Sequence, residues 1–186
     1  MLDRSRTLLL GWAAVCLVLL AGLGAAVTGG WGPLAELDQR GEGVQSWRTD
    51  VDWLRHLLAG VEVVFGTVGV TIMTVVLALA LVRTQRRAAI YVVVVMVATA
   101  VATTAIKLVV GRPRPEWQDV VGTLTSKSFP SGHVSSVTAL AGVCLVLSVM
   151  VVRRKTVRRV VVALGVLLVV VVALDRVLLV RHYPTD

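Results

Sequence analysis

The chain has 186 residues, of which 56% are hydrophobic, and its mean hydropathy is +0.84. Soluble domains contain about 45–50% apolar residues, so this composition favours a membrane protein over a soluble globular one. The net charge is +8. The bare basic loops are short, and membrane topology explains them better than a nucleic-acid surface does.

Five apolar runs are long enough to cross a bilayer, which requires about 20 helical residues. They predict spans near residues 7–28, 57–82, 89–110, 133–152 and 160–180. Backbone polar groups in lipid have to be satisfied within the segment, so even valine-rich runs are expected to be helical. The predicted fold class is therefore all-α, a polytopic transmembrane helix bundle. The first run also resembles a signal peptide, but four further spans follow it and favour a retained span.

The charges at the two ends of the predicted spans differ strongly. One end carries ten basic residues and one acidic residue: Arg4, Arg6, Arg83, Arg86, Arg87, Arg153, Arg154, Lys155, Arg158, Arg159 and Asp3. The chain has 19 basic and 11 acidic residues in all, so nine and ten remain for the other end. Basic loops stay on the cytoplasmic side of a membrane. We therefore expect a multi-pass protein of the cell membrane with a cytoplasmic N-terminus.

A long non-apolar stretch, residues 32–56, separates the first two predicted spans. Gly32-Pro33 and Gly41-Glu42-Gly43 act as helix breakers in this interpretation. In residues 44–58 apolar side chains recur at helical spacing: Val44, Trp47, Val51, Leu54 and Leu58. This pattern predicts an interfacial amphipathic helix on the outer leaflet. Such a helix either covers a lipid substrate or simply packs against the tops of the spans.

The first of three polar clusters follows the third predicted span. Lys107 lies near the outer end of that span, where a lone lysine most simply extends to the headgroups. It is followed by Gly111-Arg112-Pro113-Arg114-Pro115, in which glycine ends the helix and two prolines forbid its continuation. Residues before proline are held extended, so Arg112 and Arg114 are presented on a stiff segment. Basic side chains held in this way suit an anion, because the guanidinium fork matches phosphate oxygens.

The second cluster, Phe129-Pro130-Ser131-Gly132-His133, opens the fourth predicted span. Ser131 is suited to cap that helix, and a Ser-Gly pair before a helix is mostly only a cap. The free N–H groups of a helix N-terminus also favour phosphate. Gly132 lets an anion approach the backbone closely, and His133 then faces the same anion.

The third cluster runs from Arg176 through His182 to Asp186. Six helical residues turn through roughly 600°, so Arg176 and His182 do not share a face of one straight helix. Pro184 suits the first turn of a new helix, which leaves His182 at a break between two helices. Asp186 is close enough in sequence to hold the imidazole. The three clusters lie at the same end of the predicted spans and predict one anion-binding pocket on the exterior face.

Together these clusters resemble the type 2 phosphatidic acid phosphatase family of integral membrane lipid phosphatases, which is related to vanadium-dependent haloperoxidases. The first family motif is a lysine, six residues and Arg-Pro, and its spacing selects Arg114 over Arg112 as the partner of Lys107. The second motif, Pro-Ser-Gly-His, is present in full at residues 130–133.

The third family motif is Ser-Arg, five residues, His, three residues and Asp. Arg176, His182 and Asp186 fit it, but Asp175 replaces the serine and either weakens phosphate binding or pairs with an arginine. We interpret residues 1–186 as a single membrane phosphatase domain. The family usually has six spans, so we expect a sixth after residue 186 and a C-terminally truncated chain.

The resemblance implies metal-independent hydrolysis of a lipid phosphate or diphosphate through a phosphohistidine intermediate, with no cofactor. Neutral His182 is implied to attack phosphorus, with its tautomer fixed by Asp186. Protonated His133 is implied to donate to the leaving oxygen. The implied phosphate-binding groups are Lys107, Arg114, Ser131, Gly132 and Arg176.

A pocket at the outer leaflet suits a lipid phosphate that is held in the bilayer by its tail. Undecaprenyl diphosphate, phosphatidic acid and phosphatidylglycerol phosphate all fit this description. The expected partners are the bilayer and this lipid, with no nucleic acid, and the sequence does not indicate an oligomeric state. One alternative is a non-catalytic lipid-phosphate binding or transport protein, which the presence of both histidines disfavours. A haloperoxidase is the other, and the hydrophobic spans argue against it.

Overall fold

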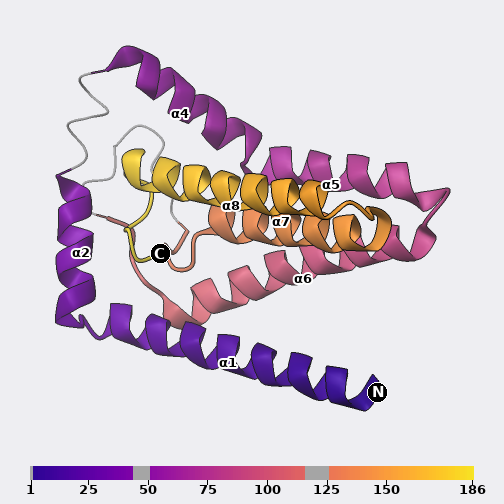
Figure 1. The fold of residues 1–186 in the computed structure, drawn as a ribbon. Helices are drawn as coiled ribbons and strands as arrows, with labels where there is room; N and C mark the ends of the chain where they lie inside the picture. Colours follow the sequence, from indigo (N-terminus) through magenta and orange to yellow (C-terminus); the bar gives the residue numbers. More distant parts are fainter. Residues whose placement is uncertain (1, 44–50, 116–125) are drawn as a thin grey trace.

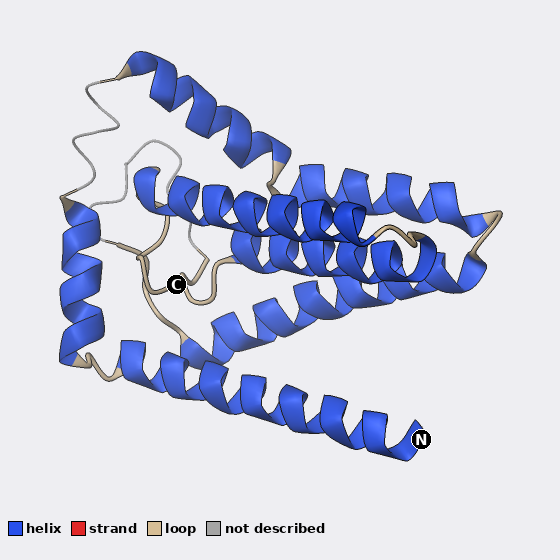
Figure 2. Cartoon of the chain, viewed as in Figure 1, coloured by secondary structure: helices blue, strands red, loops and turns tan. Residues whose placement is uncertain are grey.

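The computed structural model describes residues 2–43, 51–115 and 126–186 (Figure 1). Within these ranges all regular structure is helical, and Figure 2 shows only helices and loops there. The helices are α1 (Leu2–Thr28), α2 (Gly32–Glu42), α4 (Asp52–Val64), α5 (Thr67–Val82), α6 (Arg86–Val110), α7 (Gly132–Val151) and α8 (Lys155–Leu178). The predicted all-α class is confirmed.

Four helices are each long and apolar enough to cross a membrane, namely α1, α6, α7 and α8. The pair α4 and α5 meets the same criterion when the two helices are taken together. Large apolar side chains on these helices point outward, among them Leu9 on α1, Val68 on α5, Val109 on α6 and Leu164 on α8. Exposed surfaces of this kind are stable against lipid tails, so the chain is a multi-pass membrane protein.

The predicted span over residues 57–82 is wrong in one respect, because it consists of two helices. α4 ends at Val64, α5 begins at Thr67, and their axes differ by 49°. The break falls at Gly66, which has an extended conformation (φ −70°, ψ 177°) before α5. Hydrophobicity continues across this break, so composition alone cannot reveal the change of direction. Of the predicted amphipathic helix, residues 44–50 lie outside the described ranges and residues 52–58 belong to α4.

The helix α2 was not predicted. Gly32-Pro33 was interpreted as a breaker, but proline is well tolerated in a first helical turn, where its missing N–H has no partner to lose. Figures 1 and 2 show α2 lying across the end of the bundle. A Cβ at Gly41 would lie 2.8 Å from two ring carbons of Pro184. The absence of a side chain at Gly41 therefore allows α2 to pack directly on the turn near the C-terminus.

The helices α5, α6, α7 and α8 form the bundle, whereas α1 diverges from it towards the N-terminus (Figure 1). The buried core of the bundle consists of Val70, Met96, Val137, Leu140 and Val172. The end of α6, the start of α7 and the end of α8 lie together near the C-terminus, beside α2. The basic turns that join α5 to α6 and α7 to α8 lie at the opposite end.

Candidate active site

A cavity of about 330 Å³ lies where α6, α7 and α8 converge. Six of the eight predicted site residues line it: Lys107, Arg114, Gly132, His133, Arg176 and His182. The remaining lining residues are Thr67, Ala100, Thr103, Thr104, Ser126 and Ser136. Two imidazoles and three cationic side chains thus surround one small space, which is an arrangement suited to an anion.

His182 reaches this cavity because the chain turns sharply after α8. Val180 has a left-handed conformation (φ 58°), which is rare for a β-branched residue. The backbone N–H groups of Arg181 and His182 both donate to the carbonyl of Arg176, at 3.0 and 3.2 Å. The predicted break between Arg176 and His182 is therefore present, although Pro184 lies in a turn and starts no helix in the described chain.

His182 and Asp186 form a buried pair. Nδ1 of His182 lies 3.1 Å from Oδ2 of Asp186, which also accepts the backbone N–H of Tyr183 at 3.0 Å. An Nδ1–H donated to the carboxylate leaves Nε2 of the ring with its lone pair, 3.4 Å from Nη1 of Arg114, which also lines the cavity.

Burial is the main cause that lowers the pKa of His182, and the nearby charges of Arg114 and Lys107 lower it further. The hydrogen bond and charge of Asp186 oppose this shift without reversing it. Burial also pushes the pKa of Asp186 upward, but the hydrogen bond and charge of His182 and the charge of Arg112 outweigh it, so that this pKa ends below its ordinary value. Near neutral pH the imidazole is therefore neutral and the carboxylate ionised.

Hydrogen bonds to backbone carbonyls hold the cationic groups of Arg114 and Lys107 at the cavity. Nη1 of Arg114 lies 3.4 Å from Nε2 of His182, and its Nε donates to the carbonyl of Ser126 at 2.8 Å. Burial lowers the pKa of Arg114, yet a guanidinium remains charged at any physiological pH. Lys107 Nζ donates to the carbonyls of Lys127 and Ser128 at 2.6 and 3.0 Å, which leaves one of its three donors for a ligand.

Arg176 and His133 form the opposite side of the cavity. Nη1 of Arg176 lies 3.3 Å from Nε2 of His133 and 3.0 Å from Oε1 of Glu62. Nε and Nη2 of Arg176 both donate to Oδ2 of Asp175, at 2.9 and 2.5 Å. The Arg176 side chain is only 1% exposed, so two carboxylates and one imidazole fix its orientation. The predicted alternative that Asp175 pairs with a neighbouring arginine is present in this contact.

Ser131 and Gly132 differ in their relation to the cavity. A Cβ at Gly132 would meet no atom within 4 Å, so the space above its backbone is open. Ser131 occupies the N-cap position of α7, but its hydroxyl makes no capping hydrogen bond and has no partner among the described residues. It lines a neighbouring cavity of about 360 Å³ together with Asp186. Its backbone N–H donates to the carbonyl of Asp186 at 3.0 Å.

A sequence model of the PAP2 superfamily matches residues 87–186, which is more than half of the chain and includes all eight predicted site residues. The chain belongs to the PAP2 superfamily. The expected relationship to type 2 phosphatidic acid phosphatases is thereby confirmed. No curated protein sequence matches the chain.

This PAP2 chain is also similar in structure to a protein described as the first transmembrane PAP2 type phosphatidylglycerolphosphate phosphatase from Bacillus subtilis. The two share 18% sequence identity, with a TM-score of 0.80 over 93% of this chain and 85% of the other. At this identity the likeness establishes a common transmembrane fold, and it agrees with the bundle described above.

Three residues around the PAP2 site were not recognised from the sequence. Asp38 on α2 and Thr185 bind Arg112, which points to carboxylates instead of joining Arg114 at the cavity. Glu62, near the end of α4, pairs with Arg176. An ionisable residue inside an apolar span was the signal for Glu62, whereas Asp38 lies in a polar stretch where nothing distinguishes it from its neighbours.

The charged side chains that line this cavity are mostly cationic. In the ranges that the structure describes, no three His, Cys, Asp or Glu side chains are arranged to hold a metal ion. The carboxylates of Asp175, Asp186 and Glu62 each contact an arginine or a histidine. The chemistry available to these residues is the binding of an anion between two imidazoles.

Proposed function

We propose that this PAP2 protein hydrolyses a phosphate ester or phosphate anhydride of a membrane lipid, with a phosphohistidine formed on His182. The observation that supports this most directly is that each imidazole lies beside an arginine in one cavity. Nε2 of His182 lies 3.4 Å from Arg114 and Nε2 of His133 lies 3.3 Å from Arg176. A phosphoryl group between the two rings contacts a nucleophile, an acid and cationic donors at once.

In the proposed reaction the lone pair on Nε2 of neutral His182 forms a bond to phosphorus. The bond from phosphorus to the lipid oxygen breaks, and protonated His133 gives its proton to that oxygen. Water then attacks the phosphohistidine and loses a proton to His133, which releases inorganic phosphate and regenerates His182. Asp186 keeps the proton on Nδ1 and stabilises the positive charge that the ring acquires. The phosphoryl oxygens are held by Arg114, Arg176, Lys107 and the N–H of Gly132. Ser131 helps to position Asp186 through the hydrogen bond that its backbone N–H donates to the Asp186 carbonyl.

An apolar groove beside the cavity supports a lipid substrate. A cavity of about 440 Å³ extends between α5 and α6 and shares Thr67, Ala100 and Ser136 with the catalytic cavity. Its other lining residues are mostly apolar, among them Val70, Leu79 and Met96. A headgroup between the histidines can therefore continue directly into an apolar chain among these helices.

The substrate classes that fit are undecaprenyl diphosphate and phosphatidic-acid-type lipids, including phosphatidylglycerol phosphate, the substrate named for the Bacillus subtilis protein of similar fold. The basic turns lie at the end of the bundle away from the cavity, and basic loops favour the cytoplasm. We therefore place the N-terminus in the cytoplasm and the active site at the outer leaflet of the plasma membrane.

The test is phosphate release by detergent-purified protein from each of these lipids, combined with trapping of a phosphoenzyme on a ³²P-labelled substrate. Wild-type protein should release phosphate and carry label, and His182→Ala should do neither. His56 is an exposed histidine on α4, and its ring contacts the carbonyl of Asp52; His56→Ala is the matched control and should behave as wild type. Lipid binding without phosphate release would instead support a non-catalytic binding or transport protein.

A further inference from the structure

A second polar cluster lies behind the His182–Asp186 pair, outside the catalytic cavity. Its centre is Arg112, whose side chain is only 9% exposed. Nη1 of Arg112 donates to Oδ1 of Asp186 at 2.6 Å, and Nη2 donates to Oδ2 of Asp38 at 2.5 Å. The guanidinium plane also lies over the ring of Tyr183, 4.0 Å from its centroid. One arginine therefore bridges a carboxylate on α2 and the carboxylate that holds the catalytic imidazole.

The carboxylate of Asp186 is saturated by these contacts. Its Oδ2 accepts from His182 and from the backbone of Tyr183, while its Oδ1 accepts from Arg112 and, at 3.2 Å, from the hydroxyl of Ser128. A carboxylate has about four lone-pair sites, so four donors leave it little freedom to rotate. Of these donors Arg112 alone carries a fixed charge.

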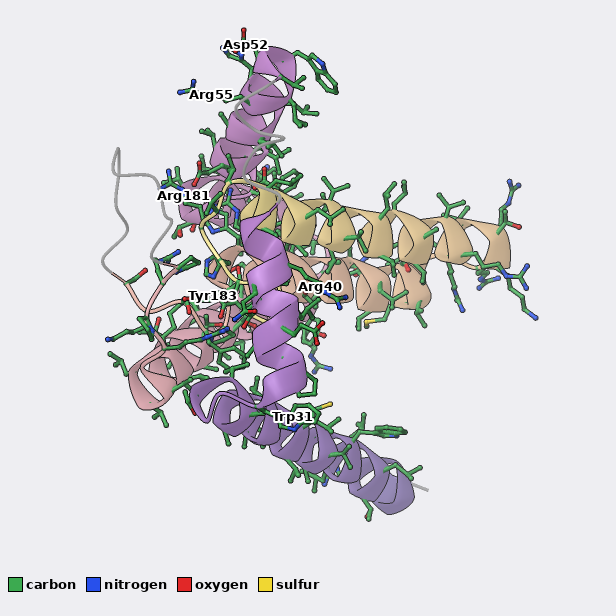
Figure 3. All side chains as sticks on the ribbon, turned by 90° about the vertical axis from the view of Figure 1, so that its left-hand side faces the viewer. Trp31, Arg40, Asp52, Arg55, Arg181 and Tyr183 are labelled. Carbon is green, nitrogen blue, oxygen red and sulfur yellow. The ribbon has the colours of Figure 1, made fainter. Side chains whose placement is uncertain are left out.

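Asp38 on α2 contacts this cluster through Thr185 as well as through Arg112. Both carboxylate oxygens of Asp38 accept the hydroxyl of Thr185, at 2.9 Å each, and Oδ1 also accepts the backbone N–H of Thr185 at 3.2 Å. The same hydroxyl accepts from Arg112 at 2.9 Å. Figure 3 shows Tyr183 beside α2. Asp38 thereby fixes both the arginine and the residue that precedes Asp186.

We propose that Asp38 and Arg112 are positioning residues of the hydrolase, which fix the carboxylate of Asp186 and through it the orientation and charge of His182. This inference rests on the proposed function, because it assigns a role within that reaction. Neither residue lines the catalytic cavity, so neither contacts the phosphoryl group. At metal-binding histidines, removing the outer partner that orients the ring typically costs about 10- to 100-fold in affinity or activity, and we expect an effect of that size on rate here.

The two residues have opposite charges, and this makes the role testable. Without Arg112 the charge of Asp186 is less compensated, so it stabilises the imidazolium of His182 more strongly. Without the charge of Asp38 the field of Arg112 is less compensated, and the imidazolium is stabilised less. Removing Arg112 therefore favours protonation of His182, and removing the charge of Asp38 disfavours it. The other groups that face His182 are Arg114, Lys107, His133 and Asp186 itself, and they are the same in every variant.

The experiment compares Arg112→Gln, Arg112→Lys, Asp38→Asn and Glu36→Gln in detergent. Glu36 is two residues from Asp38 on α2, is exposed and pairs with Arg40, so Glu36→Gln removes the same charge without touching the cluster. Phosphate release from phosphatidic acid is measured against pH. The ring of His182 is titrated separately by ¹⁵N NMR, with its signals assigned from their loss in His182→Gln.

Arg112→Gln should lower kcat about 10- to 100-fold with little change in KM, and should move both the acid limb and the His182 titration to higher pH. Asp38→Asn should move both to lower pH, and Glu36→Gln should move neither. Arg112→Lys keeps the charge but loses the fork, so it should leave the titration near that of wild type while kcat falls. If Arg112→Gln does not fold, Asp38→Asn still tests the effect of charge on the His182 titration, and Arg112→Lys still tests the effect of the guanidinium geometry on kcat.

Unchanged kcat and an unchanged His182 titration in Asp38→Asn and in whichever Arg112 variants fold would overturn the inference. Shifts of Arg112→Gln and Asp38→Asn in the same direction would also overturn it. If the wild-type protein releases no phosphate but the two variants still shift the His182 titration in opposite directions, the proposed reaction is wrong and the positioning role stands. If the wild-type protein hydrolyses the lipid normally but the variants do not shift the His182 titration, only the positioning role is wrong.

Discussion

Asp175 accepts two hydrogen bonds from Arg176 on a single carboxylate oxygen, at 2.9 Å from Nε and 2.5 Å from Nη2. Both side chains are 1% exposed. The same arginine lines the cavity between the two histidines. The charge that should attract a phosphoryl group is therefore partly cancelled by the residue next to it in the sequence, where the family motif has serine.

Asp175→Ser should strengthen the binding of phosphate analogues. The substitution removes a buried negative charge beside Arg176 while Glu62 remains as a partner, so the inhibition constant for vanadate should fall about 3- to 10-fold, since a tenfold change needs only about 1.4 kcal/mol. The unfolding temperature should fall because a buried ion pair is broken. Asp175→Asn keeps the shape without the charge and should change vanadate affinity in the same direction. Weaker vanadate binding in both variants would contradict this reasoning.

The dependence of activity on pH should follow from the lowered pKa of His182. His182 must be neutral to act as the proposed nucleophile, and burial moves its pKa below the ordinary imidazole value of about 6.5. The acid limb of kcat/KM should therefore lie below that value, and activity should persist in mildly acidic solution. Asp186 stays ionised across this range because its pKa is also below its ordinary value.

The proposed reaction needs one neutral and one protonated imidazole, so the same profile should also fall on its alkaline side and have a bell shape. The measurement is kcat/KM between about pH 4 and 9, with matching His182 titration by NMR. A profile that is flat across the histidine range would count against two imidazoles in opposite protonation states.

Gly41→Ala should reduce activity although it changes no polar group. The added Cβ would lie 2.8 Å from the ring of Pro184, so α2 and the turn that carries Asp186 have to separate. A misplacement of about 1 Å near a reacting group can cost on the order of 100-fold in rate. A Cβ added at Gly60 on α4 would meet no atom within 4 Å. Gly60→Ala is therefore the control, and it should leave activity unchanged and slightly stabilise the helix. Equal activity of the two variants would show that α2 does not hold the site.

Chelation should leave the reaction intact. The groups that surround the phosphoryl position are arginines, a lysine and histidines, which can supply all of the charge stabilisation. Activity should therefore be unchanged after dialysis against EDTA, and vanadate should inhibit competitively. Activity lost in EDTA and restored by Mg²⁺ would be evidence for a metal-dependent reaction.

The helical class and most of the spans could be predicted because lipid forces an apolar segment to satisfy its own backbone. Six of the cavity residues were also predictable, since each cluster has local signals such as the proline that follows Arg114. The same signal is present at Arg112, which nevertheless points away from the cavity. The bend between α4 and α5 was not, because it changes direction without changing hydropathy. The contact between Asp38 and Arg112 joins residues that are 74 positions apart, and no local period encodes a pairing over that separation.

The cluster around Arg112 draws its carboxylates from the first quarter of the chain and from its last described residue. During synthesis the carboxylate of Asp38 therefore emerges well before that of Asp186, so α2 is made before its partners in this cluster. The cluster should therefore close only when the turn after α8 packs against α2, and the His182–Asp186 pair should gain its fixed orientation in that step.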